Sequence, residues 1–238
     1  MSENRDLKWR PAVLDGFAVL VGILLAFAID AWWDLRNQDE EARSYLQALE
    51  TELIDNRRII DRDFQSLQRW VAESRAFLED VVSPEANPSY ERVSEMVWKT
   101  GPDQTTSLLR AAVDDLTSSG GLQTIRSAEL RRAIAQYVRT LESDAGELDD
   151  LRNNFREYVL QYHIEYGSFT EFSWEEYAEV EESSVSFQLD VDAFAANRTY
   201  ANLLIVRILN FTNLRDSHRE VQAQIDQVLA LIPYAEHE

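Results

Sequence analysis

The sequence predicts an all-α protein: an N-terminal transmembrane helix that continues into a long stalk helix, then an antiparallel helical bundle. The 238 residues include only 7 glycines and 5 prolines, so few positions can break a helix. An early stretch is almost wholly apolar, and beyond it apolar side chains recur at spacings of 3, 4 and 7. We therefore expect a tail (1–10), a membrane helix (11–33) and a helical-bundle domain (34–238) that begins with a stalk helix (34–82).

The apolar stretch, LDGFAVLVGILLAFAIDAWWD, carries Asp15 near its start and Asp30 near its end. The residues between these acids would rise only about 21 Å as a helix, less than a hydrocarbon core of roughly 30 Å. Extended from Trp9 to Trp33, the helix is about 36 Å long, with Trp9, Trp32 and Trp33 as anchors at the membrane boundaries. The alternatives are a buried core helix or a cleaved signal peptide, for which no convincing cleavage site follows.

Small residues and acids share one side of this helix. At about 100° per residue, Ala18, Gly22 and Ala26 form an i, i+4 ridge that Asp15 and Asp30 extend. Small residues let helices approach closely in lipid, and a carboxylate facing lipid is costly. The ridge thus predicts an interface, with a second copy in a homo-oligomer or with a membrane partner protein. Alternatively, both carboxylates only reach the headgroups and the small residues are incidental.

Basic residues near the apolar stretch predict its orientation. Arg5, Lys8 and Arg10 precede it, whereas only Arg36 and Arg43 follow within about 15 residues. This bias favours a cytoplasmic N-terminus and a periplasmic or extracellular domain. Nearly all basic residues are arginine and alanine is abundant, which indicates a bacterial source. We expect a single-pass protein of the bacterial inner membrane.

Breaks in the apolar pattern divide the domain into helices. The stalk contains no glycine or proline before Pro84. Asn56 interrupts its apolar stripe, so the stalk is either one straight helix or a helix kinked near Asn56. Gly120 and Gly121 are typical of a helix end, and Ser127 of a helix start. Helices are expected at 34–82, 90–99, 106–118, from Ser127 to Gly167, and from 191 to Pro233, with an acidic, aromatic loop at 167–190.

Two segments carry a resemblance: GILLAFAIDAWWDLRNQDEEARSYLQALETEL (22–53) and DDLTSSGGLQTIRSAELRRAIAQY (114–137). Both are similar to a large set of uncharacterised bacterial single-span proteins. These share an acid before the apolar run, an Asp, Glu or Asn followed by Trp after it, and a LxxSGxLxxIxxxxLRxxLxxY segment. The resemblance implies membrane anchoring and a helical domain, and no activity. It marks as positions of interest Ser119, Gly120, Gly121 and Arg131. From the residues alone, the glycines are a helix end that sets the angle between two bundle helices.

Chemical motifs are scarce. The net charge of −20 argues against nucleic acid as a partner, because phosphate binding needs clustered cations. The chain has no cysteine, no HExxH or EF-hand spacing and no phosphate-binding loop. His163 and Glu165 are two apart and do not share a helix face. Asp190 is expected to cap a helix rather than to bind a metal. We therefore expect no enzyme activity, no metal and no cofactor.

Two function classes follow. The first is a membrane-anchored helical interaction, scaffold or sensor protein, with the lipid bilayer and a protein in the membrane as partners. The alternative is an ion-coupled or pore-forming subunit that uses the intramembrane Asp15, with Asp30. RPAVLDGFAVLVG is similar in arrangement to the channel partner of rotary stator complexes, in which an early carboxylate titrates. The two classes differ in whether Asp15 must be ionisable.

Overall fold

A computed structural model describes residues 9–99, 105–168 and 188–235, and the all-α prediction is confirmed for them. Side chains at 9–16, 18, 98–99 and 234–235 lie outside this description. The helices are α1 (Trp9–Phe77), α2 (Tyr90–Lys99), α3 (Ala111–Ser118), α4 (Ala128–Asn154), α5 (Leu160–Tyr166), α6 (Val191–Phe194) and α7 (Arg198–Ala235). The π-helical turn Leu78–Val82 ends α1, and a second one, Phe155–Val159, joins α4 to α5.

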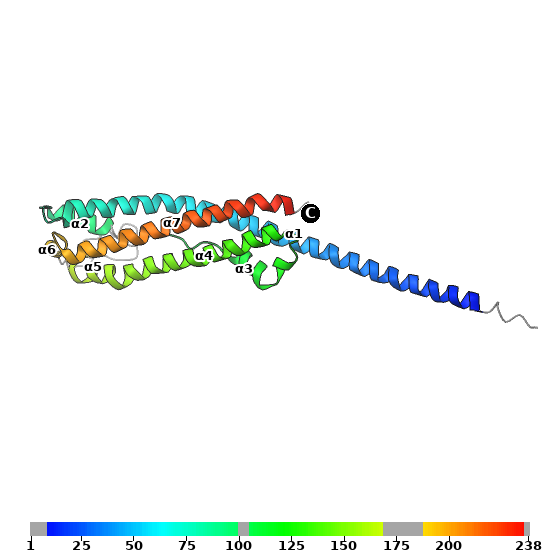
Figure 1. Cartoon of the computed structure of the whole chain (residues 1–238). Coiled ribbons are helices and arrows are strands. Elements are labelled where there is room, and N and C mark those ends of the chain that lie inside the picture. Colours follow the sequence, from blue (N-terminus) through cyan, green and yellow to red (C-terminus); the bar gives the residue numbers. More distant parts are fainter. Residues whose placement is uncertain (1–8, 100–104, 169–187, 236–238) are drawn as a thin grey trace, which may run out of the picture.

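Helices α1, α4 and α7 form an elongated bundle, from which the N-terminal part of α1 protrudes (Figure 1). Helix α7 packs against both α1 and α4. Helices α1 and α4 run in the same direction and only α7 runs against them, so the bundle is antiparallel in part (Figure 1). The reason is that α3 lies at the end of the bundle from which α1 protrudes, and α4 starts there.

The core consists of three apolar clusters along the bundle. The cluster next to the protruding end includes Leu49, Leu53, Ile134 and Ile225. A smaller middle cluster surrounds Leu67, Leu151 and Leu214. The cluster at the far end is aromatic and includes Phe77, Phe194 and Tyr200. The apolar stripe of the stalk therefore faces the bundle core from Leu46 to Val71.

Local signals explain most helix ends. The side chain of Ser127 accepts a hydrogen bond from the Leu130 N–H, which confirms the expected cap of α4. Gly120 has φ +84° just after α3, the left-handed conformation that glycine adopts at a helix end. The Asp190 carboxylate accepts from the N–H groups of Asp192 and Ala193, so it caps α6 as expected.

Three expected boundaries were wrong. Helix α3 begins at Ala111 rather than at 106, because side chains of α1 bind the preceding backbone. The helix expected from 191 is divided, because the Asn197 side chain accepts from the Thr199 and Tyr200 N–H groups and caps a new helix, α7. Helix α7 also continues through Pro233, since a proline in the last turn removes only one hydrogen bond.

Helix α1 continues through Asn56 without a break. Among the described residues, no helix is both long and apolar enough to cross a membrane.

Candidate functional site

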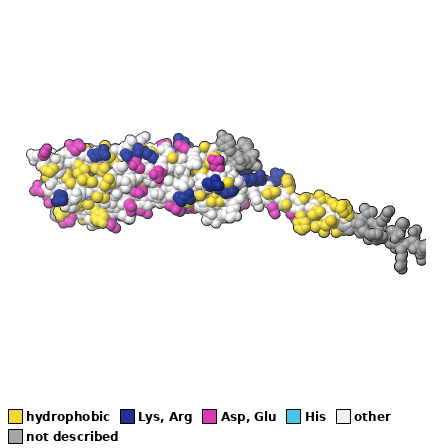
Figure 2. All heavy atoms as spheres, viewed as in Figure 1, with side chains coloured by type: hydrophobic (Ala, Val, Ile, Leu, Met, Phe, Trp, Pro, Cys, Tyr) yellow, Lys and Arg dark blue, Asp and Glu magenta, His cyan; other side chains and the backbone are white. Residues whose placement is uncertain are grey.

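The N-terminal part of α1 exposes many apolar side chains between residues 17 and 35, here called the apolar segment, with Asp30 and Asp34 as its charged members. It lies beyond the bundle, and none of the other helices that the structure describes packs against it (Figures 1 and 2). Phe17 is 63% exposed, Phe27 67% and Trp33 58%. The other exposed members are Val19, Leu20, Val21, Ile23, Leu24, Leu25, Ile29, Trp32 and Leu35. At about 100° per residue they cover most of the helix circumference.

The predicted ridge lies within this segment. Gly22, Ala26 and Asp30 are exposed, and a Cβ added at Gly22 would meet no atom within 4 Å. Trp32 is exposed beside Trp33 and stands 5.8 Å from the Arg36 guanidinium. Three further predicted residues have side chains outside the description: Trp9, Asp15 and Ala18. No described element packs on the ridge, so its role as an interface stays a prediction.

The turn marked by the resemblance holds α3 against α1. A Cβ added at Gly121 would lie 2.8 Å from the Tyr45 ring, so only glycine fits there without a shift. The Ser119 side chain accepts from the Gly121 N–H at 3.3 Å. Arg131, on α4, donates to the carbonyl groups of Ile125 and Arg126. These residues shape the turn that joins α3 to α4.

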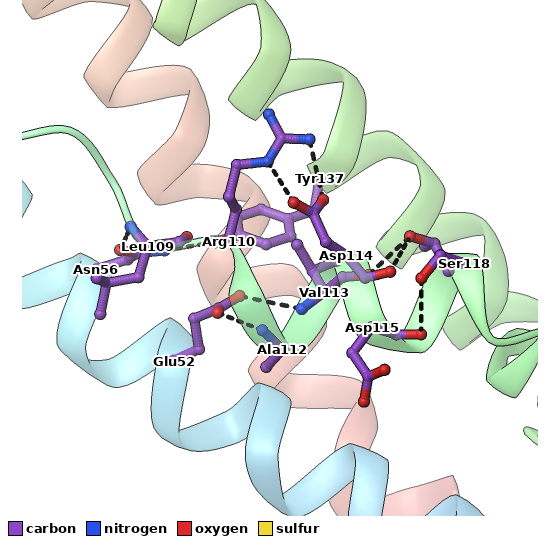
Figure 3. A network of polar contacts seen from close by, with 11 residues as sticks. Glu52, Asn56, Leu109, Arg110, Ala112, Val113, Asp114, Asp115, Ser118 and Tyr137 are labelled. Atoms are coloured by element: carbon purple, nitrogen blue, oxygen red, sulfur yellow. Dashed lines mark hydrogen bonds and ion pairs between the residues drawn. The ribbon is translucent and has the colours of Figure 1, made fainter.

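Two polar side chains of α1 bind the start of α3 (Figure 3). The Glu52 carboxylate accepts from the Ala112 N–H at 2.6 Å and from the Val113 N–H at 3.2 Å. It therefore satisfies free N–H groups at a helix start, where negative charge is favourable. Asn56 exchanges two hydrogen bonds with the Leu109 backbone. Its amide also donates to the Tyr137 hydroxyl at 2.8 Å, and burial raises the pKa of that hydroxyl.

A buried charged triad joins the three long helices. His218 on α7 is fully buried, and its Nδ1 lies 2.7 Å from the Asp144 carboxylate on α4. Its Nε2 lies 3.7 Å from the Asp63 carboxylate on α1. Burial disfavours the imidazolium, but the two carboxylates outweigh it and raise the pKa of His218 to about 9. His218 is therefore a cation at neutral pH.

A small cavity borders the triad at Asp144. That cavity measures about 100 Å³ and is lined by Ser107, Leu108 and Asp144, among others. Asp63 also accepts from the Thr106 N–H at 3.1 Å, so it fixes the same backbone segment that Asn56 binds. His218 and Asp63 are almost wholly buried, so the triad joins α1, α4 and α7 in the interior of the bundle.

At the far end of the bundle lies a second buried histidine. The His163 ring is 2.8 Å from the Tyr200 hydroxyl, and burial lowers the pKa of His163 to about 4, helped by the charge of Arg207. Arg207 is itself buried, with its guanidinium over the rings of Phe155 and Phe211 at 4.9 and 4.7 Å. Neutral His163 and cationic His218 thus have opposite electrostatic surroundings.

Sequence reasoning missed these buried polar groups. Glu52, Asn56 and Asp63 are spaced by 4 and 7, which places them on the face of Leu49, Leu53 and Ile60. A polar residue at a core position was therefore the available signal. Of these residues, only Asn56 stands out as an interruption of the apolar stripe, where it leaves a kink as an alternative. Nothing in the sequence indicated the distant partners, His218 and Asp144.

Comparisons of this chain with protein-family models, curated proteins and solved structures found no match. The resemblance to bacterial single-span proteins therefore stays a prediction.

Proposed function

We propose that this protein is a membrane-tethered helical interaction protein, a scaffold or sensor whose acidic bundle stands on a stalk outside the cytoplasm. The observation that carries the proposal is the apolar segment, exposed around most of its circumference. Contiguous apolar surface of this kind marks a partner or a membrane. Because bulky apolar side chains point in most directions, lipid covers them better than a partner on one side would.

The C-terminal end of the segment fits the same proposal. Trp32 and Trp33 lie where the apolar run gives way to the charged residues Arg36, Asp39 and Glu40. Tryptophan is enriched at the two interfaces between membrane and water. The proposed span runs from Trp9 to Trp33, so its first turns belong to the part whose side chains are not described.

Fractionation of cells that express the full chain tests the proposal. We expect the wild-type chain to stay in the membrane pellet after an alkaline wash. Leu24→Arg combined with Leu25→Arg should move it to the soluble fraction, because each central arginine costs about 2.5–3.5 kcal/mol on insertion. Leu209→Arg is the matched control, since Leu209 is a leucine of α7 that is 55% exposed.

A wild-type chain recovered in the soluble fraction would refute the anchor. Loss of the Leu209→Arg variant from the pellet would mean that any surface arginine has the same effect, and the segment would then have no special role.

The ion-coupled alternative stays a prediction, because the side chain of Asp15 lies outside the description. It requires that Asp15→Asn abolishes function while the protein is still made and inserted. Under the interaction proposal, the Asn variant is inserted and remains active.

A further inference from the structure

The outward face of α7 is apolar along the first half of the helix. The buried residues of α7 recur at alternating steps of 4 and 3, which defines the opposite face as the outward one: Tyr200, Leu204, Arg207, Phe211, Leu214, His218 and Val221. On that outward face Ile205 is 46% exposed, Val206 41% and Leu209 55%, and the exposed Asn202 and Asn213 lie at either end. We call these five residues the α7 patch. In Figure 2, apolar side chains gather on the bundle toward the end where α7 begins.

Beyond the patch, the same face becomes charged. Asp216, Arg219 and Glu220 are exposed there, and Asp216 pairs with Arg219 at 2.7 Å. A helix face in contact with water normally carries residues of this kind. Residues 199–214, by contrast, include no acid, and their single charged residue, Arg207, is buried. The patch is therefore an uncharged area on a chain with 43 acidic residues, and exposed apolar surface of this kind marks a contact.

Charge and hydrogen-bonding capacity favour a second copy of this chain as the occupant. Two copies with a net charge of −20 each repel one another, so an uncharged area is where they can meet. The amide of an asparagine both donates and accepts hydrogen bonds. Asn202 and Asn213 can therefore pair with the same residues of the copy, which two carboxylates or two guanidinium groups could not do. The patch is in this sense self-complementary, as a contact about a two-fold axis requires.

The proposed anchor supplies the geometry. Two copies anchored in one membrane have the same orientation and hold the patch at the same height. A two-fold axis along the membrane normal then brings the patch onto its copy, with the two α7 helices parallel and in register. Five side chains cover less than the roughly 800 Å² that each partner buries in a stable interface, so the contact is weak between free molecules. Confinement to one membrane raises the effective concentration and compensates for this weakness.

We propose that the α7 patch is the contact through which the bundles of two copies of this chain pair in parallel. This contact lies in the bundle and is separate from the ridge of the apolar segment. The inference rests on the proposed membrane anchor.

Disulfide crosslinking in membranes from cells that express the full chain tests the contact. The chain has no cysteine, so Leu209→Cys introduces a single thiol. A disulfide needs Cα atoms about 4.4–6.8 Å apart, a separation that only paired patches provide. After oxidation with copper phenanthroline, we expect the covalent dimer to be the main product. Ser143→Cys, at an exposed position of α4, is the control and should give little dimer.

Two charged variants in the Leu209→Cys background test whether the patch itself holds the copies together. Val206→Glu places like charges opposite one another and should lower the dimer yield severalfold, and Asn202→Asp should act in the same way without a change of shape. The matched controls make comparable changes at exposed positions outside the patch: Ala223→Glu and Asn153→Asp. Both controls should leave the dimer yield unchanged.

Equal dimer yields from Leu209→Cys and Ser143→Cys would overturn the contact. A yield that survives both Val206→Glu and Asn202→Asp would also overturn it, because the membrane helices alone would then bring the copies together. So would the same loss in the matched controls, or a product of Cys-substituted chain with a protein of another mass. Fractionation keeps the two proposals distinguishable: a chain in the pellet that gives no dimer refutes only this inference, whereas a soluble chain refutes the anchor and the parallel pairing together.

Discussion

Asn56 and Leu109, 53 positions apart, are joined by two hydrogen bonds of 2.7 Å each. The Asn56 amide donates to the Leu109 carbonyl and accepts from the Leu109 N–H, as a paired backbone would. This contact fixes a non-helical segment on the side of α1. It lies at the centre of the polar contacts that position α3.

We expect Asn56→Ala to lower the free energy of unfolding by about 2–4 kcal/mol, because it leaves the Leu109 N–H and carbonyl without their partner. Thermal unfolding of the full chain in mild detergent, followed by circular dichroism, measures the change. Asn153→Ala, at an exposed position of α4, is the control. Equal effects of the two substitutions would mean that the Asn56 contacts contribute nothing particular.

The two buried histidines predict a stability maximum near pH 6.5. The pKa of His218 is raised from its ordinary value of 6.5 to about 9, so folding takes up a proton between these values. The free energy of unfolding then falls as the pH rises through that window, by at most about 1.4 kcal/mol per unit. The pKa of His163 is lowered to about 4, so stability falls as the pH drops from 6.5 toward 4.

Denaturant unfolding between pH 4 and pH 9 checks both sides of this maximum. His163→Gln should flatten the acid side and leave the alkaline side. Asp144→Asn should move the alkaline fall to lower pH, because it removes the largest favourable contact of the imidazolium. An alkaline side that Asp144→Asn leaves in place would show that another group causes it.

Replacing each of two glycines by alanine should change the free energy of unfolding in opposite directions. Gly121→Ala places a Cβ 2.8 Å from the Tyr45 ring and 3.0 Å from Leu116, so we expect a loss of about 1–3 kcal/mol. Gly146→Ala meets nothing within 4 Å and lies inside α4, so it should gain about 0.5–1 kcal/mol. Denaturant unfolding of both variants measures whether each substitution raises or lowers the free energy of unfolding. Tyr45→Ala should reduce the cost of Gly121→Ala, and a cost unchanged in that background would locate the strain elsewhere.

The ridge makes a prediction about assembly. Gly22→Leu and Ala26→Leu fill the space through which a second helix would approach, so crosslinked dimers or partner complexes in the membrane should decrease severalfold. Val21→Leu, on another side of α1, is the control and should have little effect. If crosslinking and native mass are the same in all three variants, the ridge is not an interface.

The orientation can be measured because the chain contains no cysteine. A cysteine at Ser118, which is exposed on α3, should react with a membrane-impermeant maleimide added outside the inner membrane. A cysteine at Ser2 should react only after the membrane is opened. The opposite pattern would place the bundle in the cytoplasm.

Local patterns predicted much of the fold. Helix α2 occupies the expected residues, Tyr90–Lys99, and the Ser127 cap and the Gly120 turn lie where the sequence indicated. These features depend on neighbours within one or two turns, which a sequence reveals directly.

The wrong predictions concern places where residues distant in the sequence determine the local conformation or the helix direction. Residues 106–110 have a helical pattern, but Asp63 and Asn56 bind the backbone of Thr106 and Leu109, and this segment is not helical. The direction of α4 depends on where α3 docks, and the Gly121 contact with Tyr45 contributes to that docking. His218 and Asp144 are 74 positions apart, and nothing in either local sequence indicates the other.

Helix α1 is a single helix of 69 residues that carries the apolar segment at one end and bundle contacts at the other. From Leu35 to Phe77 it extends about 63 Å. As a rigid lever, it converts a tilt of about 10° at the base into a sideways movement of roughly 11 Å at its far end. Small changes in the tilt of the apolar segment would therefore produce large displacements at the end of the bundle near Phe77.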